Sequence, residues 1–331
     1  MSYRSPLLDT TPGAVEADGA DAGVAAHYGS DLREQRMLAA GNGFVDLSHR
    51  DVLTITGPDR LSWLHALTTQ HVDGLAAGTS TTALILSPTG HVEYVMYGVD
   101  DGETFWLHTE PGTGAALLEW LRSMVFMSRV ELADATTSYA IVWRPGPATG
   151  AGIVRAGADS LGGHEVFLPR DELGALDGPA AGVWAYEALR IAAGAPRLGL
   201  DSDARAIPNE LGWLGVAVHL DKGCYRGQET VARVHNLGRP PRRLVRLHLD
   251  GSVDHLPAHG DPVQYDGKQV GFVGSAARHH ELGPVALALV KRSVPAEVEL
   301  VAVGTDDGPA VVASQEPLVD PEVGLHVRAR L

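Results

Sequence analysis

The stretch D-K-G-C-Y-R-G-Q-E, residues 221–229, contains Cys224, the only cysteine of the 331-residue chain. This cysteine lies between two cations, Lys222 and Arg226, and two glycines bracket it at a spacing of four. Glycine permits a positive φ and a close approach of the backbone to another group, and neighbouring positive charge favours the thiolate form of a cysteine. The pattern predicts an exposed turn that presents a reactive thiol. The alternative is a glycine-rich turn whose cysteine packs as a small apolar side chain.

The same stretch resembles the K-G-C-Y-x-G-Q-E signature of the YgfZ family. These folate-binding proteins are related to the glycine-cleavage T-protein and are linked to iron–sulfur cluster assembly and repair. A match at every fixed position is far more specific than a lone glycine motif. The signature residues are Lys222, Gly223, Cys224, Tyr225, Arg226, Gly227, Gln228 and Glu229. The resemblance implies that Cys224 is the working residue, as a transient thiol that contacts a cluster, a client protein or a mixed disulfide.

The composition narrows the classes of function. With 44% hydrophobic and 20% charged residues, the chain is typical of a soluble globular protein of two or three domains. A net charge of −15 disfavours generic binding to nucleic acid or to anionic membranes. One cysteine cannot form an intramolecular disulfide, and no run approaches the ~18 apolar residues of a spanning helix. The N-terminus has no apolar signal-peptide region, so we expect a cytoplasmic protein.

Motifs of several enzyme classes are absent from the sequence. The chain contains no G-x-x-x-x-G-K-[ST], H-E-x-x-H or G-x-S-x-G, so a P-loop NTPase, a zincin and a serine hydrolase have no support. With a single cysteine and scattered histidines, one chain cannot supply a tetra-cysteine cluster site. We therefore expect no metal site. Seven cations between residues 222 and 246 form a basic group that would suit a small anionic ligand or a solvated surface.

A second resemblance lies near the N-terminus. Residues 1–30 are rich in Gly, Ala, Asp and Thr without periodicity, which predicts a flexible arm. The run F-V-D-L-S-H at residues 44–49 precedes a strand at 52–56, and G-P-D at 57–59 begins an apolar helix. This order is similar to the amino-terminal part of the T-protein fold. It supports the family independently of the cysteine motif.

The rest of the chain predicts alternating strands and helices, followed by strands alone. We expect a hairpin at 82–87 and 91–99, strands at 103–108, 139–144, 165–168 and 229–234, and helices at 113–127 and 183–193. From about residue 240, short alternating runs without a helical pattern predict a small antiparallel barrel or sandwich.

The resemblance implies an α+β fold of several domains, in which helices flank antiparallel sheets and a small antiparallel β-barrel ends the chain. We expect a flexible arm at 1–30 and a first folate-binding subdomain at 31–145. A second subdomain at 146–240 would carry the signature, and the barrel would occupy 241–331.

The resemblance also implies which residues hold tetrahydrofolate or a derivative. The run L-R-I-A-A-G at 189–194 resembles the T-protein helix whose arginine contacts the folate, so Arg190 would pair with an anionic group of the ligand. Glu187 precedes it by three residues, and a simple ion pair is the alternative. Glu93 and Tyr94 stand where T-proteins have an Asp-Asp pair that acts on the folate amine. Residues 161–164, L-G-G-H, replace the T-protein's Gly-Glu-Asp-Gly and bring no carboxylate to the pterin.

The leading hypothesis is a folate-binding accessory protein that supports the assembly or repair of iron–sulfur enzymes, with Cys224 as its thiol. We expect an accessory protein more than an aminomethyltransferase, because Glu93 and Tyr94 replace the aspartate pair. A catalytic carboxylate must first lie within reach of the folate amine, and the longer side chain of Glu93 would place its carboxylate differently. Its partners would be folate and iron–sulfur client or assembly proteins, with no nucleic acid and no membrane. The alternatives are a folate-dependent aminomethyltransferase or demethylase that uses Glu93, and a structural hinge at the cysteine turn.

Overall fold

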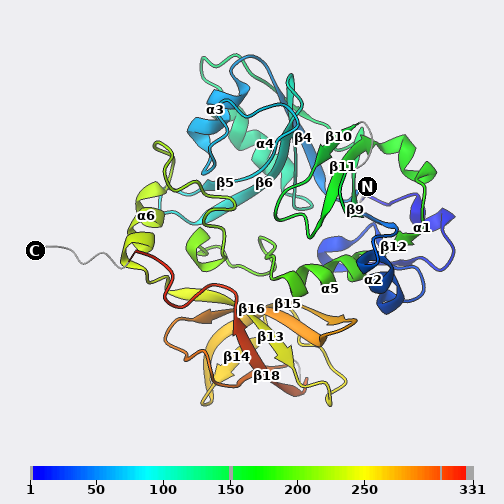
Figure 1. Ribbon diagram of the computed structural model, residues 1–331, viewed down its shortest axis with the longest axis vertical. Helices are drawn as coiled ribbons and strands as arrows, with labels where there is room; N and C mark the ends of the chain where they lie inside the picture. The colour runs from blue at the N-terminus through cyan, green and yellow to red at the C-terminus, as the bar shows by residue number, and fades with distance from the viewer. Residues whose placement is uncertain (1–2, 149–151, 306–307, 326–331) are drawn as a thin grey trace, which may run out of the picture. The chain divides into compact units, whose positions relative to one another are not determined.

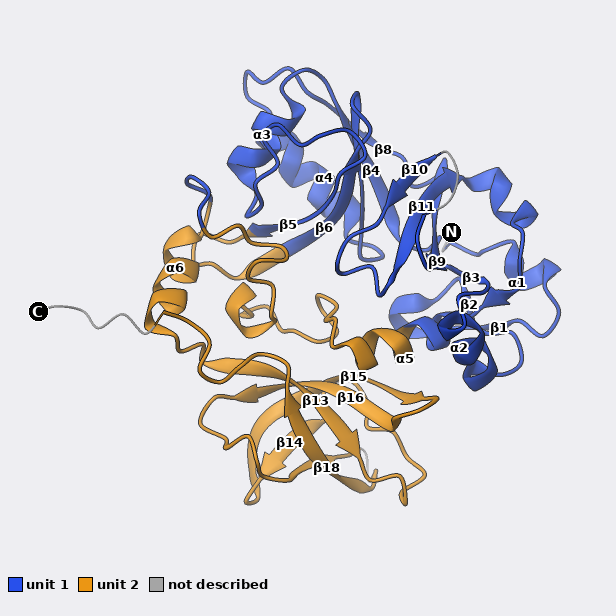
Figure 2. Ribbon diagram, in the orientation of Figure 1, with its two compact units in different colours: residues 1–85, 94–186, 221–225 blue, residues 86–93, 187–220, 226–331 orange. Residues whose placement is uncertain are grey.

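The computed structural model describes residues 3–148, 152–305 and 308–325. The chain forms two units, each assembled from separate segments (Figure 2). Unit 1 contains residues 1–85, 94–186 and 221–225, and unit 2 contains residues 86–93, 187–220 and 226–331. The chain therefore crosses from one unit to the other several times. One crossing lies inside the signature, between Tyr225 and Arg226.

The first sheet has the strand order β5-β6-β7-β4-β8 (Figure 1). Its strands are β4 (Asp51–Thr56), β5 (Ser80–Leu86), β6 (Val92–Asp100), β7 (Thr104–Thr109) and β8 (Glu131–Asp134). Strand β4 pairs antiparallel with β7 on one side and with β8 on the other. Helices α3 (Arg60–Leu67) and α4 (Gly114–Ser123) share its apolar core, to which α3 contributes Trp63 and Leu64. Burial of one face of each element explains the apolar spacing in the sequence.

The second sheet has the order β10-β11-β9-β3-β12. Its strands are β3 (Phe44–Asp46), β9 (Tyr139–Pro145), β10 (Ile153–Arg155), β11 (Gly163–Pro169) and β12 (Ala180–Ala181). The pairs of β11 with β9 and of β3 with β9 are antiparallel, whereas β12 runs parallel to β3. Phe44, Val142 and Leu168 lie in its core, and the 3-10 helix η2 (Arg170–Ala175) adds Leu173.

The expected flexible arm is replaced by ordered structure over residues 3–30. This segment contains α1 (Leu7–Thr10), β1 (Val15–Glu16), the 3-10 helix η1 (Gly19–Asp21) and β2 (Ala25–His27). Leu7, Val24 and Ala26 are buried, and Leu7 joins the core of the second sheet. Small residues produced no periodicity in the sequence, but they allow close packing here. Helix α2 (Asp31–Ala39) follows and ends before Gly41, whose φ is 80°.

The C-terminal strands close into a barrel of order β13-β16-β15-β14-β17-β18 (Figure 1). The strands are β13 (Arg242–Leu249), β14 (Pro262–Tyr265), β15 (Lys268–His279), β16 (Gly283–Lys291), β17 (Leu300–Val303) and β18 (Ala310–Pro317). Leu247, Val273 and Val290 are among the buried residues that fill its interior. Closure removes the sheet edges that would otherwise be exposed. The predicted α+β class with antiparallel sheets and a C-terminal barrel is therefore confirmed.

Helix α5 spans Val183–Ala193, as predicted. The predicted strand at 229–234 is wrong: these residues belong to helix α6 (Gln228–Leu237). Its ends carry left-handed glycines, Gly227 with φ 80° and Gly238 with φ 65°. Val231 and Val234 are β-branched, and such residues favour strands in the absence of other constraints. Their spacing of three places them on one side of a helix, and Val231 is buried.

Candidate functional site

The turn that carries Cys224 exposes this residue to solvent. Two residues earlier, Lys222 is buried, and its ammonium group donates to the carbonyl oxygens of His65, Thr68 (2.5 Å) and Gln70 (3.3 Å). These carbonyls lie in and just beyond the last turn of α3, where a cation also interacts favourably with the helix dipole. Burial lowers the pKa of Lys222 to about 8. Within unit 1, Lys222 therefore anchors the start of the signature to α3.

The second half of the signature is anchored in unit 2. Arg226 Nη1 lies 3.0 Å from Glu93 Oε2, and both side chains are about one-third exposed. Gly227 begins α6, and a Cβ placed on it would lie 2.5 Å from Ser87 O and 2.9 Å from the Cα of Gly90. Both the positive φ and the lack of space for a side chain therefore require glycine at this position. The turn of the β5–β6 hairpin thus packs directly against the start of α6.

Glu93 and Tyr94 lie at the start of β6, where successive side chains point to opposite faces of the sheet. Tyr94 packs against the apolar core of the first sheet. Glu93 instead faces Arg226, so the structure joins one predicted folate residue to the signature. An ion pair as exposed as this one contributes about 0–1 kcal/mol. The carboxylate of Glu93 is thus held by a weak contact that a ligand could replace.

Arg190 lies in a buried ionic network of unit 2. Its Nε donates to Glu187 at 3.0 Å, its Nη1 to Asp201 Oδ2 at 2.8 Å, and its Nη2 to Ser275 Oγ at 2.6 Å. Only 3% of Arg190 is exposed. Arg197 adds a second cation 3.1 Å from Glu187. The ion pair between Glu187 and Arg190, left open by the sequence, is therefore formed, and a folate contact by Arg190 stays a prediction.

A buried polar cluster in unit 1 was not identified from the sequence. Arg155 is 1% exposed and donates to Glu165 (2.7 Å), Asp159 (2.5 Å) and Thr82 Oγ1 (2.6 Å). Its guanidinium carbon lies 5.1 Å from the centre of the Tyr97 ring. Arginine and glutamate are rarely buried unless they are paired, and two of the partners of Arg155, Thr82 and Glu165, lie on the strands β5 and β11. Only the topology could bring them together.

His108 belongs to the same cluster. Its ring is fully buried and stacks on Tyr97 with centroids 5.0 Å apart. Within the described residues its Nε2 has no hydrogen-bond partner, and Glu165 Oε1 lies 3.9 Å away. Burial lowers the pKa of His108 well below its usual value, and the charges of Arg50 and Arg155 act in the same direction. The histidine is therefore held neutral. In the sequence, the one indication of this buried cluster is a histidine that follows three apolar residues in β7.

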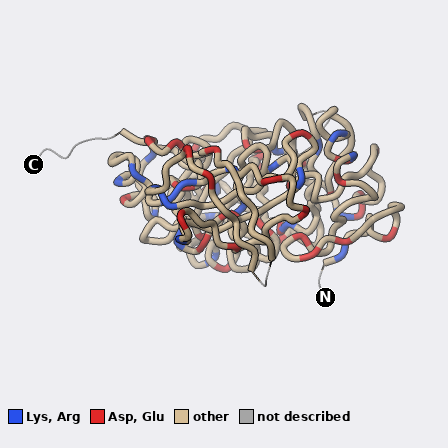
Figure 3. The backbone as a smooth tube through the Cα atoms, turned by 90° about the horizontal axis from the view of Figure 1, so that it is seen from below, with Lys and Arg blue, Asp and Glu red and all other residues tan. Residues whose placement is uncertain are grey.

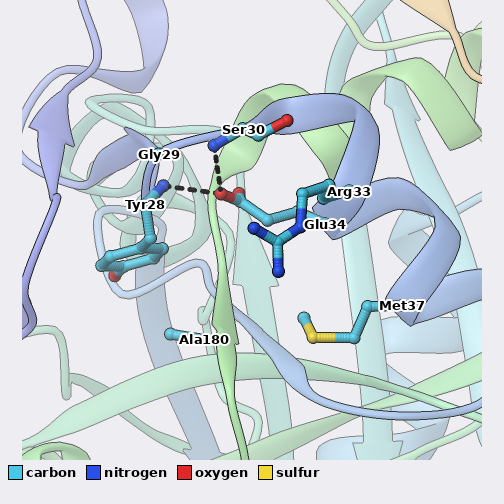
Figure 4. Close-up of a pocket in the computed structure, with 7 residues that line it drawn as sticks. All are labelled: Tyr28, Gly29, Ser30, Arg33, Glu34, Met37 and Ala180. Atoms are coloured by element: carbon cyan, nitrogen blue, oxygen red, sulfur yellow. Dashed lines mark hydrogen bonds between the residues drawn. The ribbon is translucent and has the colours of Figure 1, made fainter.

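A surface pocket of about 460 Å³ lies beside the first turns of α2 in unit 1 (Figure 4). Glu34 lines it, but both oxygens of its carboxylate accept backbone N–H groups. Oε1 accepts from Tyr28 (2.8 Å) and Ser30 (3.3 Å), and Oε2 accepts from Gly182 (2.8 Å). This carboxylate joins three chain segments and has a structural role. None of the predicted site residues lines the pocket.

The basic group around the signature is neutralised by partners. Arg242 pairs with Asp203 (2.7 Å) and Glu210 (2.8 Å), and Arg246 pairs with Glu316 (2.5 Å). Figure 3 shows cations and carboxylates interspersed along the chain. Among the described residues, no group of three or more His, Cys, Asp or Glu is arranged to hold a metal ion. In the same part of the chain, no helix has both the length and the apolar character needed to cross a membrane.

Family models match two parts of the chain. Residues 13–157 match the GCVT N-terminal domain, and residues 242–320 match the glycine cleavage T-protein C-terminal barrel domain. The chain also resembles the solved structure of the glycine cleavage system aminomethyltransferase T from Bartonella henselae. The TM-score is 0.79 over 96% of this chain and 97% of that one, at 18% identity. The match confirms the predicted fold.

Curated relatives have similar lengths. A putative chloroplastic transferase of Arabidopsis thaliana is 26% identical over 91% of this chain and 77% of its own length. An aminomethyltransferase of Symbiobacterium thermophilum is 27% identical over 84% of this chain and 86% of its own. An aminomethyltransferase of Streptomyces avermitilis is 26% identical, with 88% and 91% covered. The similarity therefore extends beyond the two matched domains.

The two glycines of the signature should respond differently to substitution. Gly227→Ala places a Cβ 2.5 Å from Ser87 O on a backbone with φ 80°, whereas a Cβ at Gly223 meets no atom within 4 Å. Gly227→Ala should lower the free energy of unfolding by at least about 1–2 kcal/mol. Gly223→Ala, its matched control, should change it by about 0.5 kcal/mol or less. Thermal unfolding monitored by circular dichroism compares them, and equal melting temperatures would refute the packing argument.

His108 should make the protein sensitive to acid. Because the pKa of His108 is lowered in the folded state, the unfolded chain takes up the proton first. Stability should therefore fall as the pH drops below about 6.5, the usual pKa of histidine. His108→Phe keeps an aromatic ring beside Tyr97 but removes this titration. Urea unfolding midpoints between pH 8 and 5 should fall less steeply in the variant, and parallel pH profiles would contradict the assignment.

Proposed function

We propose that this chain, which contains the N-terminal domain and the C-terminal barrel domain of the glycine-cleavage T-protein, is a folate-binding accessory protein. It supports the assembly or repair of iron–sulfur enzymes, and Cys224 is its working thiol. The observation that carries this proposal is the exposure of Cys224 on a turn with anchors on both sides. Lys222 holds the turn on α3, and Gly227 packs against the hairpin turn. A structural cysteine would be expected inside the protein.

The two cations that flank Cys224, Lys222 and Arg226, each have a partner in the structure. The ammonium group of Lys222 is bound by carbonyl oxygens, and Arg226 pairs with Glu93. Both cations therefore support the turn through partners other than the sulfur. We infer that the signature serves to present the thiol at a fixed position. A partner protein or a cluster can then approach Cys224 from solvent.

Tetrahydrofolate or a derivative is the proposed ligand, because aminomethyltransferases with these domains act with it. Arg190, Glu187, Glu93 and Tyr94 are the proposed contacts. Arg190 could pair with an anionic group of the folate only if it exchanged one of its present partners, Glu187 or Asp201. Glu93 could meet the folate by exchanging Arg226. The second exchange is the easier one, since this pair is partly exposed.

The alternative function is a folate-dependent aminomethyltransferase or demethylase. The names of the curated relatives favour it, and Glu93 is a carboxylate at the start of β6. Against it stand the ion pair between Glu93 and Arg226 and the sequence L-G-G-H at 161–164, which lacks a carboxylate. A catalytic group displaced by about 1 Å can lose on the order of 100-fold in rate. The accessory function is therefore preferred.

Cys224→Ser should separate the accessory function from folding and folate binding. In a deletion strain of the source organism, wild-type protein should restore the activity of iron–sulfur enzymes and the variant should not. Because the serine hydroxyl replaces an exposed thiol, melting temperature and tetrahydrofolate affinity, measured by calorimetry, should stay the same. Full complementation by Cys224→Ser would overturn the role of the thiol. A large loss of stability would instead favour the structural hinge.

Glu93→Gln should test the transferase. We expect neither wild type nor variant to form methylenetetrahydrofolate and ammonia from a loaded lipoyl carrier protein at a T-protein-like rate, because Glu93 replaces the aspartate with a longer side chain and is paired with Arg226. Single-turnover assays with tetrahydrofolate measure this directly, and an authentic T-protein serves as the positive control. Robust turnover by the wild type that collapses in Glu93→Gln would replace the accessory function with the transferase.

A further inference from the structure

The pocket beside α2 has walls that are fixed to one another. Every residue that lines it belongs to the described part of unit 1. One carboxylate oxygen of Glu34 accepts the backbone N–H groups of Tyr28 and Ser30. The other oxygen accepts the N–H of Gly182, two residues beyond Ala180 of β12. A pocket that is held together in this way needs little rearrangement to bind a ligand.

Arg33 contributes to this pocket a guanidinium that has no hydrogen bond and no ion pair within the described residues. The nearest carboxylate along the helix, Glu34, is already bound by backbone N–H groups. Exposed arginines are often simply solvated, but this one lies at a pocket with an apolar lining. Figure 4 shows its guanidinium between the Tyr28 ring and the Met37 side chain. Its charge is therefore available to a ligand.

Apolar side chains form the rest of the lining. The Tyr28 ring and Ala180 both pack against the core of the second sheet. Met37 lies over the backbone of Gly43, where an added Cβ would stand 2.8 Å from Met37 Cε. An aromatic face and a polarisable thioether are favourable neighbours for a flat ring. The pocket therefore combines one unpartnered cation with a surface suited to an aromatic group.

We propose that this pocket binds a small monocarboxylate that carries an aromatic ring. Arg33 would hold the carboxylate through two parallel N–H···O bonds, the geometry that a guanidinium favours. The ring would lie between Tyr28 and Met37. The volume of about 460 Å³ is in the range of small-molecule sites. The inference does not depend on the proposed function, since none of the residues proposed for folate lines this pocket.

Charge favours a monocarboxylate over other ligands. Glu34 brings a carboxylate to the lining, and it would repel the second negative charge of a phosphate dianion. The net charge of −15 acts in the same direction. An aromatic amine would instead meet the like charge of Arg33. One guanidinium thus matches one carboxylate.

Saturation-transfer difference NMR of the full-length chain with phenylacetate tests the proposal. We expect saturable binding in the millimolar range, because a ligand of this size gains little affinity per atom. Arg33→Gln should weaken it about tenfold or more, since a charge-assisted contact is lost. Arg36→Gln is the matched control, because Arg36 is an exposed arginine on the same helix that does not line the pocket. It should bind within about twofold of the wild type.

Changes to the probe test each half of the contact without altering the protein. Acetate lacks the ring and should bind more weakly than phenylacetate. Phenethylamine keeps the ring but carries a cation, and it should give no saturable signal. Inorganic phosphate at an equal concentration should not displace phenylacetate. Both arginine variants should keep the melting temperature of the wild type, because each loses an exposed side chain.

Several results would overturn the proposal. The first is a wild type that binds no phenylacetate at about 10 mM. Equal affinities of Arg33→Gln and Arg36→Gln would remove Arg33 from the site. Binding of phenethylamine as strong as that of phenylacetate would indicate apolar adsorption alone. Displacement by phosphate would show that the site recognises any anion and does not select a carboxylate.

Discussion

The ammonium group of Lys222, buried against the end of α3, is the interaction on which the presentation of Cys224 depends. Three backbone carbonyl oxygens accept from it. A lysine is costly to bury because its charge loses hydration, and this cost is visible in the lowered pKa of Lys222. The donor contacts and the favourable end of the helix dipole offset that cost. The turn two residues later can therefore be exposed and still be fixed at its base.

Glycines provide the corresponding constraint in unit 2. The contact of Gly227 with Ser87 and Gly90 leaves no room for a side chain, so α6 begins at a set point on the β5–β6 hairpin. This contact places Arg226 beside Glu93. Signature residues on both sides of Cys224 therefore have structural roles, Lys222 before it and Gly227 after it. The contact of Gly227 also explains why Glu93 is an ion-pair partner in this chain.

Two buried ionic networks give each unit a specific polar interior. Arg190 is shared by Glu187, Asp201 and Ser275 in unit 2, and Arg155 by Glu165 and Asp159 in unit 1. Such networks add little net stability compared with apolar packing, but loss of one partner leaves a buried charge and is strongly destabilising. Buried arginines are therefore poor choices for simple binding tests. The exposed residues Cys224 and Glu93 are more informative.

Local patterns in the sequence by themselves determined helix α5 and the C-terminal strands, because periodicity, caps and turn residues act locally, whereas the α+β class followed from the family resemblance. The sequence also singled out the signature, since a match at all seven fixed positions of an eight-residue motif is specific. Tertiary structure decided the rest. Residues 3–30 pack although they lack periodicity, and residues 228–237 form a helix because Gly227 and Gly238 set its ends. The contacts of Lys222 with the end of α3, of Arg190 with Ser275, and of Arg155 with Thr82 join segments that are distant in the sequence. No local pattern can reveal such contacts, because they exist only once the chain has folded.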